Sequence, residues 1–256
     1  MSVERIQRPV EIARLQQRSG EIAAPERHPA TLVRIDMTRL IDHRVVRPED
    51  PGLAPQAYRM LRTQVLQRVR LHGVRMLGVV SAVDGEGKTI TAVNLALGIA
   101  AESNQNVLLV DLDLRRPSVA SVLGLPVEQG LEAWFAGVAS TGDICRGIEG
   151  IERLEVLPTL SAVRGSSEHL ASRRAQEMLL ELKNAQEDGI VIVDLPPVLL
   201  TDDFLTIASL LDGVILVAAE GITRREDVTR VREMLGATRL LGTVLNRASE
   251  SERRAY

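Results

Sequence analysis

The residues best suited to chemistry lie in the loop SAVDGEGKTITA, from Ser81 to Ala92. Its glycines allow backbone N–H groups to converge on phosphate oxygens, and Lys88 can reach the β- and γ-phosphates of a nucleotide while the Thr89 hydroxyl binds Mg²⁺. The stretch TAVNLALGIA then begins a helix, whose N-terminus favours an anion. Only Ala82, where the strict motif has Gly, departs from the pattern. We therefore predict an ATP and Mg²⁺ site whose loop contacts are Asp84, Gly85, Glu86, Gly87, Lys88, Thr89 and Ile90.

Three acidic residues end apolar runs elsewhere in the chain. Asp111 and Asp113 lie two apart in VLLVDLDLRRP, so on an extended chain both side chains point to one face. Asp194 ends the run VIVDLPP. One such residue could simply cap the next helix, but three of them together with a phosphate loop favour a Mg²⁺-nucleotide centre. Phosphoryl transfer also needs a carboxylate that accepts the attacking hydroxyl's proton, and Asp111 or Asp113 is the candidate.

Short apolar runs that alternate with helical patterns must position these residues. Such alternation implies crossover connections and a mostly parallel sheet, covered by helices on both faces, with the ligand at the carboxyl ends of the strands. The predicted fold is therefore an α/β P-loop NTPase. The predicted strands are 76–81, 106–113, 189–196, 213–219 and 240–246, with 154–158 as a further candidate.

Changes in composition and hydrophobic periodicity along the chain predict three segments. Residues 1–53 mix Pro, Gly and charge, which predicts a partly flexible leader with one or two short elements; its start is either a short amphipathic helix or a solvated tail. Residues 54–248 form the predicted P-loop domain. This domain opens with a helix over 55–70, on which Tyr58, Leu61, Val65 and Val69 share a face. Residues 249–256 are predicted to be a flexible tail that ends in Tyr256.

Composition excludes several classes of protein. The formal net charge of −3 argues against a nucleic-acid binder, which would carry a basic domain. The single cysteine, Cys145, excludes an internal disulfide, and the histidines show no metal-ligand spacing with it. The chain has no secretory signal pattern, and its most apolar run is far shorter than the roughly 20 residues of a membrane span. We expect a cytoplasmic protein whose membrane contact is peripheral.

Four segments carry a resemblance to a known family, in the order SAVDGEGKTITAVNLA, VLLVDLDLRRPSVASVLGL, IVIVDLPPVLLTD and LGTVLN. The chain resembles the bacterial tyrosine kinases, P-loop autokinases that regulate capsule and exopolysaccharide synthesis, from about Gln56 to Asn246. This resemblance implies that Lys88, Asp111, Asp113 and Asp194 are catalytic. It also implies that Thr89, Asp111 and Asp194 serve the metal and that Asn246 lies near the nucleotide base.

The leader carries a second part of the resemblance. The stretch VRIDMTRLIDHRVVRPED looks like the segment before the kinase domain in separately encoded, soluble members of the family. In those members the membrane half is another polypeptide. The implied partner is therefore the cytoplasmic segment of a membrane polysaccharide co-polymerase, which would place the chain at the inner membrane.

Two departures from the family pattern affect the prediction. In the family a Glu-x-x-Arg-x-x-Arg motif on the first helix assembles a ring, whereas this chain has Gln56 before Arg59 and Arg62. A homo-oligomer, ring or dimer, is predicted with a weaker contact there; the alternative is a solvated helix face. Asp84 stands where Pro is common, and an acid beside phosphates would weaken binding unless its carboxylate points to solvent.

The choice between two functions depends on whether a tyrosine hydroxyl accepts the γ-phosphate of ATP. Tyr58 lies on an apolar helix face, so Tyr256 is the predicted phosphosite among the two tyrosines of the chain. The first function is an autokinase that phosphorylates this tail tyrosine in trans and regulates polysaccharide polymerisation and export. The alternative is a nucleotide-switch ATPase that gates assembly with the co-polymerase and forms no phosphotyrosine. The lack of an extra lysine early in the loop favours the kinase, whereas a single tail tyrosine favours the switch.

Overall fold

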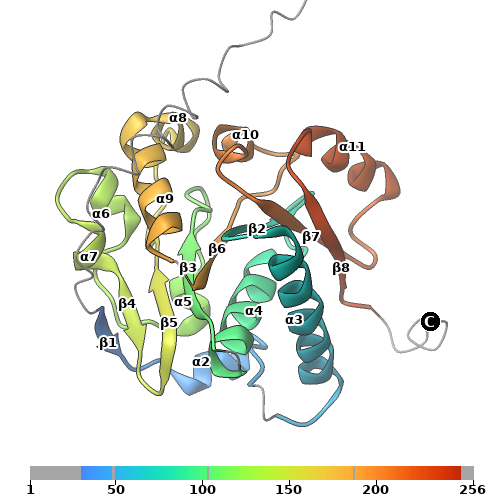
Figure 1. Cartoon of the computed structure of the whole chain (residues 1–256), viewed down its shortest axis with the longest axis horizontal. Coiled ribbons are helices and arrows are strands. Elements are labelled where there is room, and N and C mark those ends of the chain that lie inside the picture. Colours follow the sequence, from blue (N-terminus) through green and yellow to red (C-terminus); the bar gives the residue numbers. More distant parts are fainter. Residues whose placement is uncertain (1–29, 48–49, 103, 187, 249–256) are drawn as a thin grey trace, which may run out of the picture.

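The computed structural model describes residues 30–47, 50–102, 104–186 and 188–248, which form one central sheet and the helices around it (Figure 1). Its strands follow the order β1-β4-β5-β3-β6-β2-β7-β8, and all neighbours are parallel except β4 and β5. The predicted α/β fold with a mostly parallel sheet is confirmed. The strands are β1 (Thr31–Val33), β2 (Met76–Ser81), β3 (Asn106–Asp111), β4 (Arg146–Ile148), β5 (Ile151–Leu157), β6 (Gly189–Asp194), β7 (Gly213–Ala219) and β8 (Leu240–Asn246).

Two strands end earlier than the sequence predicted. β3 stops at Asp111 because the Asp111 carboxylate accepts a hydrogen bond from the N–H of Asp113, which turns the chain out of the sheet. β6 stops at Asp194 because Pro196 and Pro197 follow, and proline has no N–H to continue a ladder. Both strands therefore end at an acidic residue.

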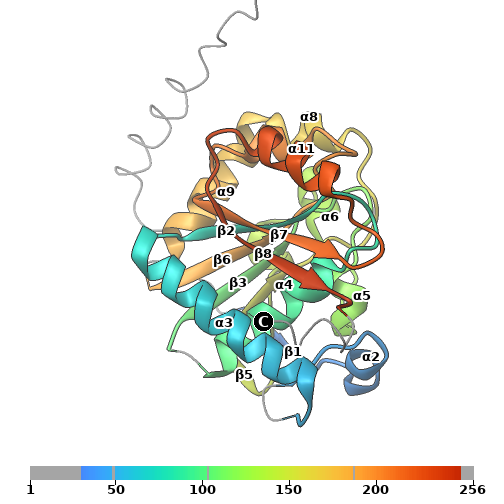
Figure 2. The same cartoon turned by 90° about the vertical axis from the view of Figure 1, so that its right-hand side faces the viewer.

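Helices cover both faces of the sheet, and Figure 2 shows α3 on one side and α11 on the other. Helices α2 to α5 pack in the core of one face, and α6 to α11 pack in the core of the other. The helices are α2 (Met37–Asp42), α3 (Leu53–His72), α4 (Lys88–Glu102), α5 (Val119–Leu123), α6 (Leu131–Phe135), α7 (Thr141–Ile144), α8 (Ser166–Ala171), α9 (Arg173–Ala185), α10 (Asp203–Ile207) and α11 (Arg225–Leu235).

The central strands are buried on both faces, which is why they read as continuous apolar runs. In β3, Val107 and Leu109 pack in the core on the α4 side, whereas Leu108 and Val110 pack in the core on the α9 side. A half-exposed strand would alternate polar and apolar residues, and a parallel strand between two helical layers does not. No helix of the described residues combines the length and hydropathy that a membrane span requires.

Part of the predicted leader is folded against the domain. β1 pairs in parallel with β4 at the sheet edge, and the side chains of Ile35, Leu40 and Val45 are buried in the core. The N–H of Val46 donates to the Asn94 side chain on α4 at 2.8 Å. Residues 30–47 thus contain β1 and α2, while residues 1–29 lie outside the described part of the chain, and the division into leader, domain and tail stays a prediction.

Candidate nucleotide-binding site

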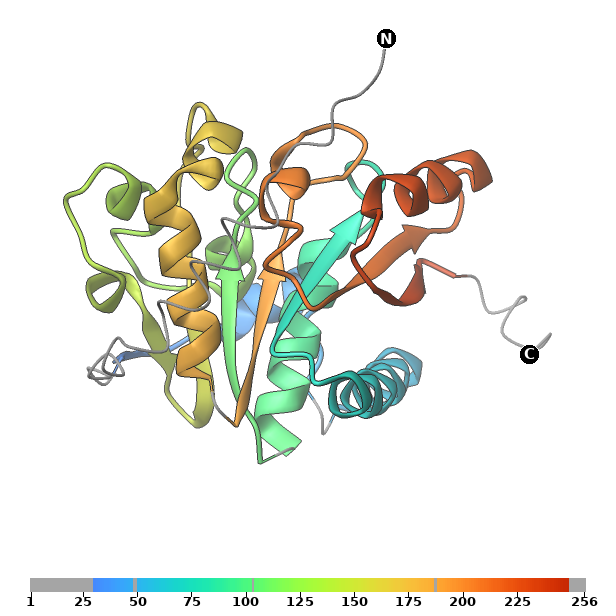
Figure 3. The same cartoon turned by 45° about the horizontal axis from the view of Figure 1, so that its top comes forward.

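The strand order brings the predicted site residues to one edge of the sheet. β6 lies between β3 and β2, and in Figure 3 the arrows of β3 (green), β6 (orange) and β2 (teal) point to the same edge. Asp111 and Asp194 are register partners at the ends of β3 and β6. The phosphate loop follows β2, and α4 begins at Lys88. Segments distant in the sequence therefore meet where a parallel sheet binds its ligand.

The phosphate loop depends on glycine at two positions. Gly85 and Gly87 have φ of +80° and +91°, a conformation that favours glycine. A Cβ at Gly87 would also lie 2.1 Å from the Asn246 side-chain nitrogen. Asn246 Nδ2 donates to the Glu86 carbonyl at 2.9 Å, and Arg247 Nη2 donates to the Gly85 carbonyl at 2.8 Å. The end of β8 thus supports the loop directly, and a contact of Asn246 with the nucleotide base stays a prediction.

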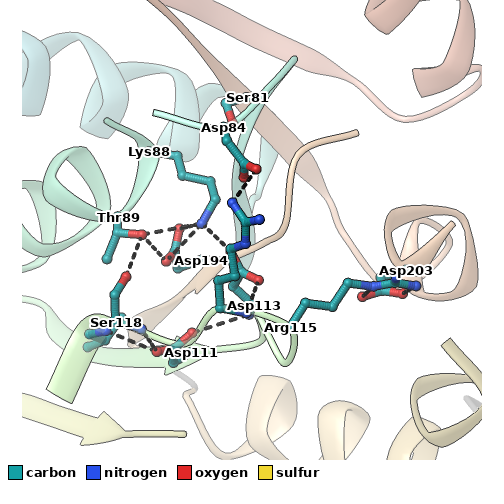
Figure 4. A network of polar contacts seen from close by, with 12 residues as sticks. Ser81, Asp84, Lys88, Thr89, Asp111, Asp113, Arg115, Ser118, Asp194 and Asp203 are labelled. Atoms are coloured by element: carbon teal, nitrogen blue, oxygen red, sulfur yellow. Dashed lines mark hydrogen bonds and ion pairs between the residues drawn. The ribbon is translucent and has the colours of Figure 1, made fainter. Parts of the chain in front are cut away.

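Lys88 is surrounded by carboxylates (Figure 4). Its Nζ lies 2.7 Å from Asp113 Oδ2 and 3.5 Å from Asp194 Oδ1, and all three side chains are nearly buried. Burial by itself would lower the pKa of the Lys88 ammonium, but the charges of Asp194 and Asp113 outweigh it and raise that pKa. Lys88 is therefore a stable cation at the position where the loop would bind phosphate.

Asp111 is engaged with backbone rather than with the lysine. Its Oδ2 accepts hydrogen bonds from the N–H groups of Ser118 and Val119, both at 3.0 Å, and its Oδ1 accepts one from Asp113. Burial, reinforced by the nearby charge of Asp194, raises the pKa of Asp111 well above its usual range. Asp111 thus holds the first turn of α5, and of the two candidate bases only Asp113 contacts Lys88 in an ion pair.

Asp194 and Thr89 form the group best suited to a metal. The Thr89 hydroxyl donates to Asp194 Oδ2 at 2.6 Å, and burial raises the pKa of Asp194 although Lys88 and Thr89 partly oppose this effect. The described residues contain no cluster of three His, Cys, Asp or Glu side chains that could hold a metal ion by themselves. Mg²⁺ in nucleotide sites needs only one or two carboxylates besides phosphates and water, so these oxygens fit Mg²⁺.

Two loop side chains predicted to contact the nucleotide have partners within the protein. Glu86 is buried, and its carboxylate accepts hydrogen bonds from the Val83 N–H at 2.9 Å and from the Thr223 hydroxyl. Asp84 forms an ion pair with Arg116 at 2.5 Å. Its half-exposed carboxylate is therefore both accessible to solvent and paired with a guanidinium. Nothing in the sequence indicates the contribution of Thr223, because it lies in a turn more than 130 residues after the loop.

Arg115, in the loop after β3, contacts residues outside the phosphate loop. Arg115, which belongs to the double-aspartate motif, points away from Lys88 towards Asp203 (Figure 4). Its Nη2 lies 3.3 Å from Asp203 Oδ1, and its Nε donates to the Ser166 hydroxyl at 3.1 Å. Asp203 is fully buried at the start of α10. Arg115 therefore ties the loop after β3 to α8 and α10.

The predicted oligomer contacts lie on α3. Gln56 is exposed near the start of this helix, and Arg59 is half-buried. Arg62 Nη1 donates to the Gly98 carbonyl of α4 at 3.4 Å, so its guanidinium also contacts its own domain. Tyr58 is half-buried on the same helix, and Tyr256 lies outside the described residues. The subunit contact and the phosphosite stay predictions.

The fold and the loop define a P-loop NTPase, and residues 74–250 match the family model described as ParA: NUBPL iron-transfer P-loop NTPase. Within this class the chain is 30% identical to the tyrosine-protein kinase YwqD of Bacillus subtilis. The match extends over 210 residues and covers 81% of this chain and 87% of the relative. The chain belongs to the bacterial tyrosine kinase family, as the sequence motifs predicted.

Solved structures agree with this assignment. The kinase domain of the Escherichia coli tyrosine kinase ETK has a TM-score of 0.68 and 25% identity, and the match covers 89% of this chain and 97% of that domain. The septum site-determining protein MinD of Pyrococcus horikoshii, complexed with Mg-ADP, has a TM-score of 0.54 and 28% identity, with 70% and 72% of the two chains covered. The structural neighbours therefore include a tyrosine kinase domain and MinD, which is named a cell division ATPase in Pyrococcus furiosus.

Proposed function

We propose that the chain is an ATP-dependent protein-tyrosine kinase that transfers the γ-phosphate of ATP to a tyrosine hydroxyl. The observation that carries the proposal is the contact of Lys88 with Asp113 at 2.7 Å, next to the Thr89–Asp194 pair. A phosphate-binding cation, metal-binding oxygens and a candidate base thus share one nearly buried site. Membership of the bacterial tyrosine kinase family supports the same reaction.

In the proposed reaction the protein positions the reacting groups and neutralises the phosphate charge, and it forms no covalent bond to the nucleotide. The loop N–H groups and Lys88 bind the β- and γ-phosphates, so phosphate oxygens replace Asp113 beside the ammonium. The released Asp113 carboxylate accepts the proton of the tyrosine hydroxyl, whose oxygen attacks the γ-phosphorus while the bond to the β-phosphate oxygen breaks and ADP leaves. Mg²⁺, held by Thr89 and Asp194, would neutralise charge on the phosphate oxygens. Asp111 keeps the loop after β3 in place.

We further propose Tyr256 as the acceptor, phosphorylated in trans by a neighbouring copy. The contact between copies would involve Gln56, Arg59 and Arg62 on α3, in a ring or dimer. The proposed partner is the cytoplasmic segment of a membrane polysaccharide co-polymerase, through which phosphorylation would regulate polymerisation and export of exopolysaccharide or capsule. The protein would then act in the cytoplasm, peripheral to the inner membrane.

Mass spectrometry tests the proposal. The purified chain is incubated with Mg-ATP, with and without the partner segment, and the tail peptide is analysed for phosphate. We expect phosphate on Tyr256 in the parent and none in Lys88→Met, which keeps side-chain bulk but loses the charge. Tyr256→Phe should abolish the signal while nucleotide affinity stays at the parental value. Absence of phosphotyrosine in the parent under both conditions would reject the kinase reaction.

A second function is supported by the likeness to MinD and to the ParA-type family model. In this alternative, ATP binding and hydrolysis switch assembly with the membrane partner and no phosphotyrosine forms. The same experiment distinguishes the two: release of inorganic phosphate that depends on Lys88 and rises with the partner segment, with an unmodified Tyr256, would favour the switch.

A further inference from the structure

Two loops are tied together at the rim of the nucleotide site. Asp84 in the phosphate loop and Arg116 in the loop after β3 form an ion pair at 2.5 Å, and their side chains are 44% and 74% exposed. Beneath it, Lys88 and Asp113 form the nearly buried pair at 2.7 Å. The second carboxylate oxygen of Asp113 accepts a hydrogen bond from the Arg116 N–H at 3.0 Å. Asp113 thus fixes the backbone from which the Arg116 side chain extends.

A nucleotide triphosphate should bind the Arg116 guanidinium more strongly than the Asp84 carboxylate does. A guanidinium binds phosphate through parallel charge-assisted hydrogen bonds, and a nucleotide triphosphate carries several negative charges where Asp84 carries one. An exposed ion pair contributes little because water and salt screen it. The pair between Asp84 and Arg116 is therefore weak enough for a bound phosphate to displace the carboxylate.

The surroundings of Arg116 indicate which phosphate it would bind. Its backbone is held by Asp113, Asp113 contacts Lys88, and a lysine in this loop position reaches the β- and γ-phosphates. The neighbouring Arg115 is directed to Asp203 and Ser166 instead. Of these two adjacent arginines, only Arg116 is joined to the phosphate loop.

We propose that Arg116 binds the terminal phosphate of the nucleotide and that Asp84 competes for it, holding the guanidinium at the rim of the site. The inference rests on the proposed nucleotide function and adds a phosphate-binding residue to it. It also gives a role to the acid that replaces proline in the loop. The pair then sets the difference in affinity between the triphosphate and the diphosphate.

Calorimetric titration with Mg-AMPPNP and with Mg-ADP tests the proposal on Asp84→Asn and on Asp84→Asn/Arg116→Gln. Freeing Arg116 from its competitor in Asp84→Asn should tighten AMPPNP binding by up to about fivefold, since exposed pairs contribute up to about 1 kcal/mol. Adding Arg116→Gln should then weaken AMPPNP binding about tenfold, as expected for a lost hydrogen bond to a charged group, and ADP binding less. Thermal unfolding of each variant checks that the fold is intact.

Controls separate this inference from the proposed function. Arg173→Gln breaks an exposed ion pair with Glu177 on α9 and removes the same charge, so it should leave both affinities unchanged. If the double variant binds AMPPNP as well as Asp84→Asn does, Arg116 only neutralises Asp84 and the inference is wrong. An equal loss for ADP and AMPPNP also overturns it. If Lys88→Met binds both nucleotides with the parental affinity, the nucleotide site itself is wrong.

Discussion

Glu86 offers a test of how the phosphate loop is held, because its side chain supports the loop from within the protein. The buried carboxylate accepts one hydrogen bond from the Val83 N–H and another from the Thr223 hydroxyl. Glu86→Ala removes both acceptors at once, which leaves the Val83 N–H and the Thr223 hydroxyl without their partner. Glu86→Gln keeps the shape and offers a carbonyl oxygen to Val83 and an amide group to Thr223.

The expected loss follows from these contacts. Hydrogen bonds to a charged group contribute about 1.5–3 kcal/mol each, and part of this is regained because Ala no longer buries a carboxylate. We therefore expect Glu86→Ala to lower the free energy of unfolding by about 3 kcal/mol. For a chain of this size, about 2–4 °C per kcal/mol corresponds to a drop of about 6–12 °C in Tm. Glu86→Gln should lose only about 1 kcal/mol.

Scanning calorimetry of the parent and both variants measures the effect, and titration with Mg-ADP measures its consequence for the loop. We expect Glu86→Ala to bind nucleotide more weakly even well below its Tm, because the Val83 N–H that Glu86 holds belongs to the phosphate loop. A Tm of Glu86→Ala within about 2 °C of the parental value would refute the reasoning. Equal losses in Glu86→Ala and Glu86→Gln would show that the negative charge, rather than the pair of acceptors, holds the loop.

Three further predictions concern the site and the oligomer. Burial raises the pKa of Asp194, so the folded chain binds this proton more tightly than the unfolded chain, and stability falls as pH rises from the ordinary value towards the raised pKa. Asp194→Asn should therefore gain stability relative to the parent as the pH rises from the ordinary carboxyl pKa towards the raised pKa of Asp194, measured by urea unfolding, and an advantage that shrinks over this range would contradict the sign. Gly87→Ala should weaken Mg-ADP binding at least about tenfold, since its Cβ would lie 2.1 Å from the Asn246 side-chain nitrogen. The control Gly221→Ala has a similarly strained φ of +74° but open space around its Cβ, so it should leave Mg-ADP affinity unchanged. Equal affinities of the two variants would show that the Asn246 side chain moves aside freely. Gln56→Glu should tighten self-association measured by sedimentation, most strongly at low salt, because a charge-assisted hydrogen bond is about twice as strong as a neutral one. An unchanged distribution of species at two salt concentrations would mean that Arg59 and Arg62 lie on a solvated helix face.

Local patterns in the sequence were sufficient for the central strands and the phosphate loop. A strand buried on both faces must be apolar throughout, so 76–81 and 213–219 were predicted with the bounds that the structure gives. The loop was recognisable because phosphate binding needs glycines and a lysine at fixed spacing. The strands β1 and β4 were not predicted, because runs of three residues such as TLV and RGI carry no readable periodicity.

The side chains that serve the site were predicted by type, but their partners were decided by the tertiary structure. The sequence by itself determined that Lys88 and three aspartates would meet, since parallel strands end at one edge of a sheet. Only the fold decided that Asp113 faces Lys88 while Asp111 binds the amides of α5. Such pairings depend on the register of neighbouring strands and on loops that approach from distant parts of the chain. The direction of a side chain at the end of a strand is set by these contacts, which no local pattern encodes.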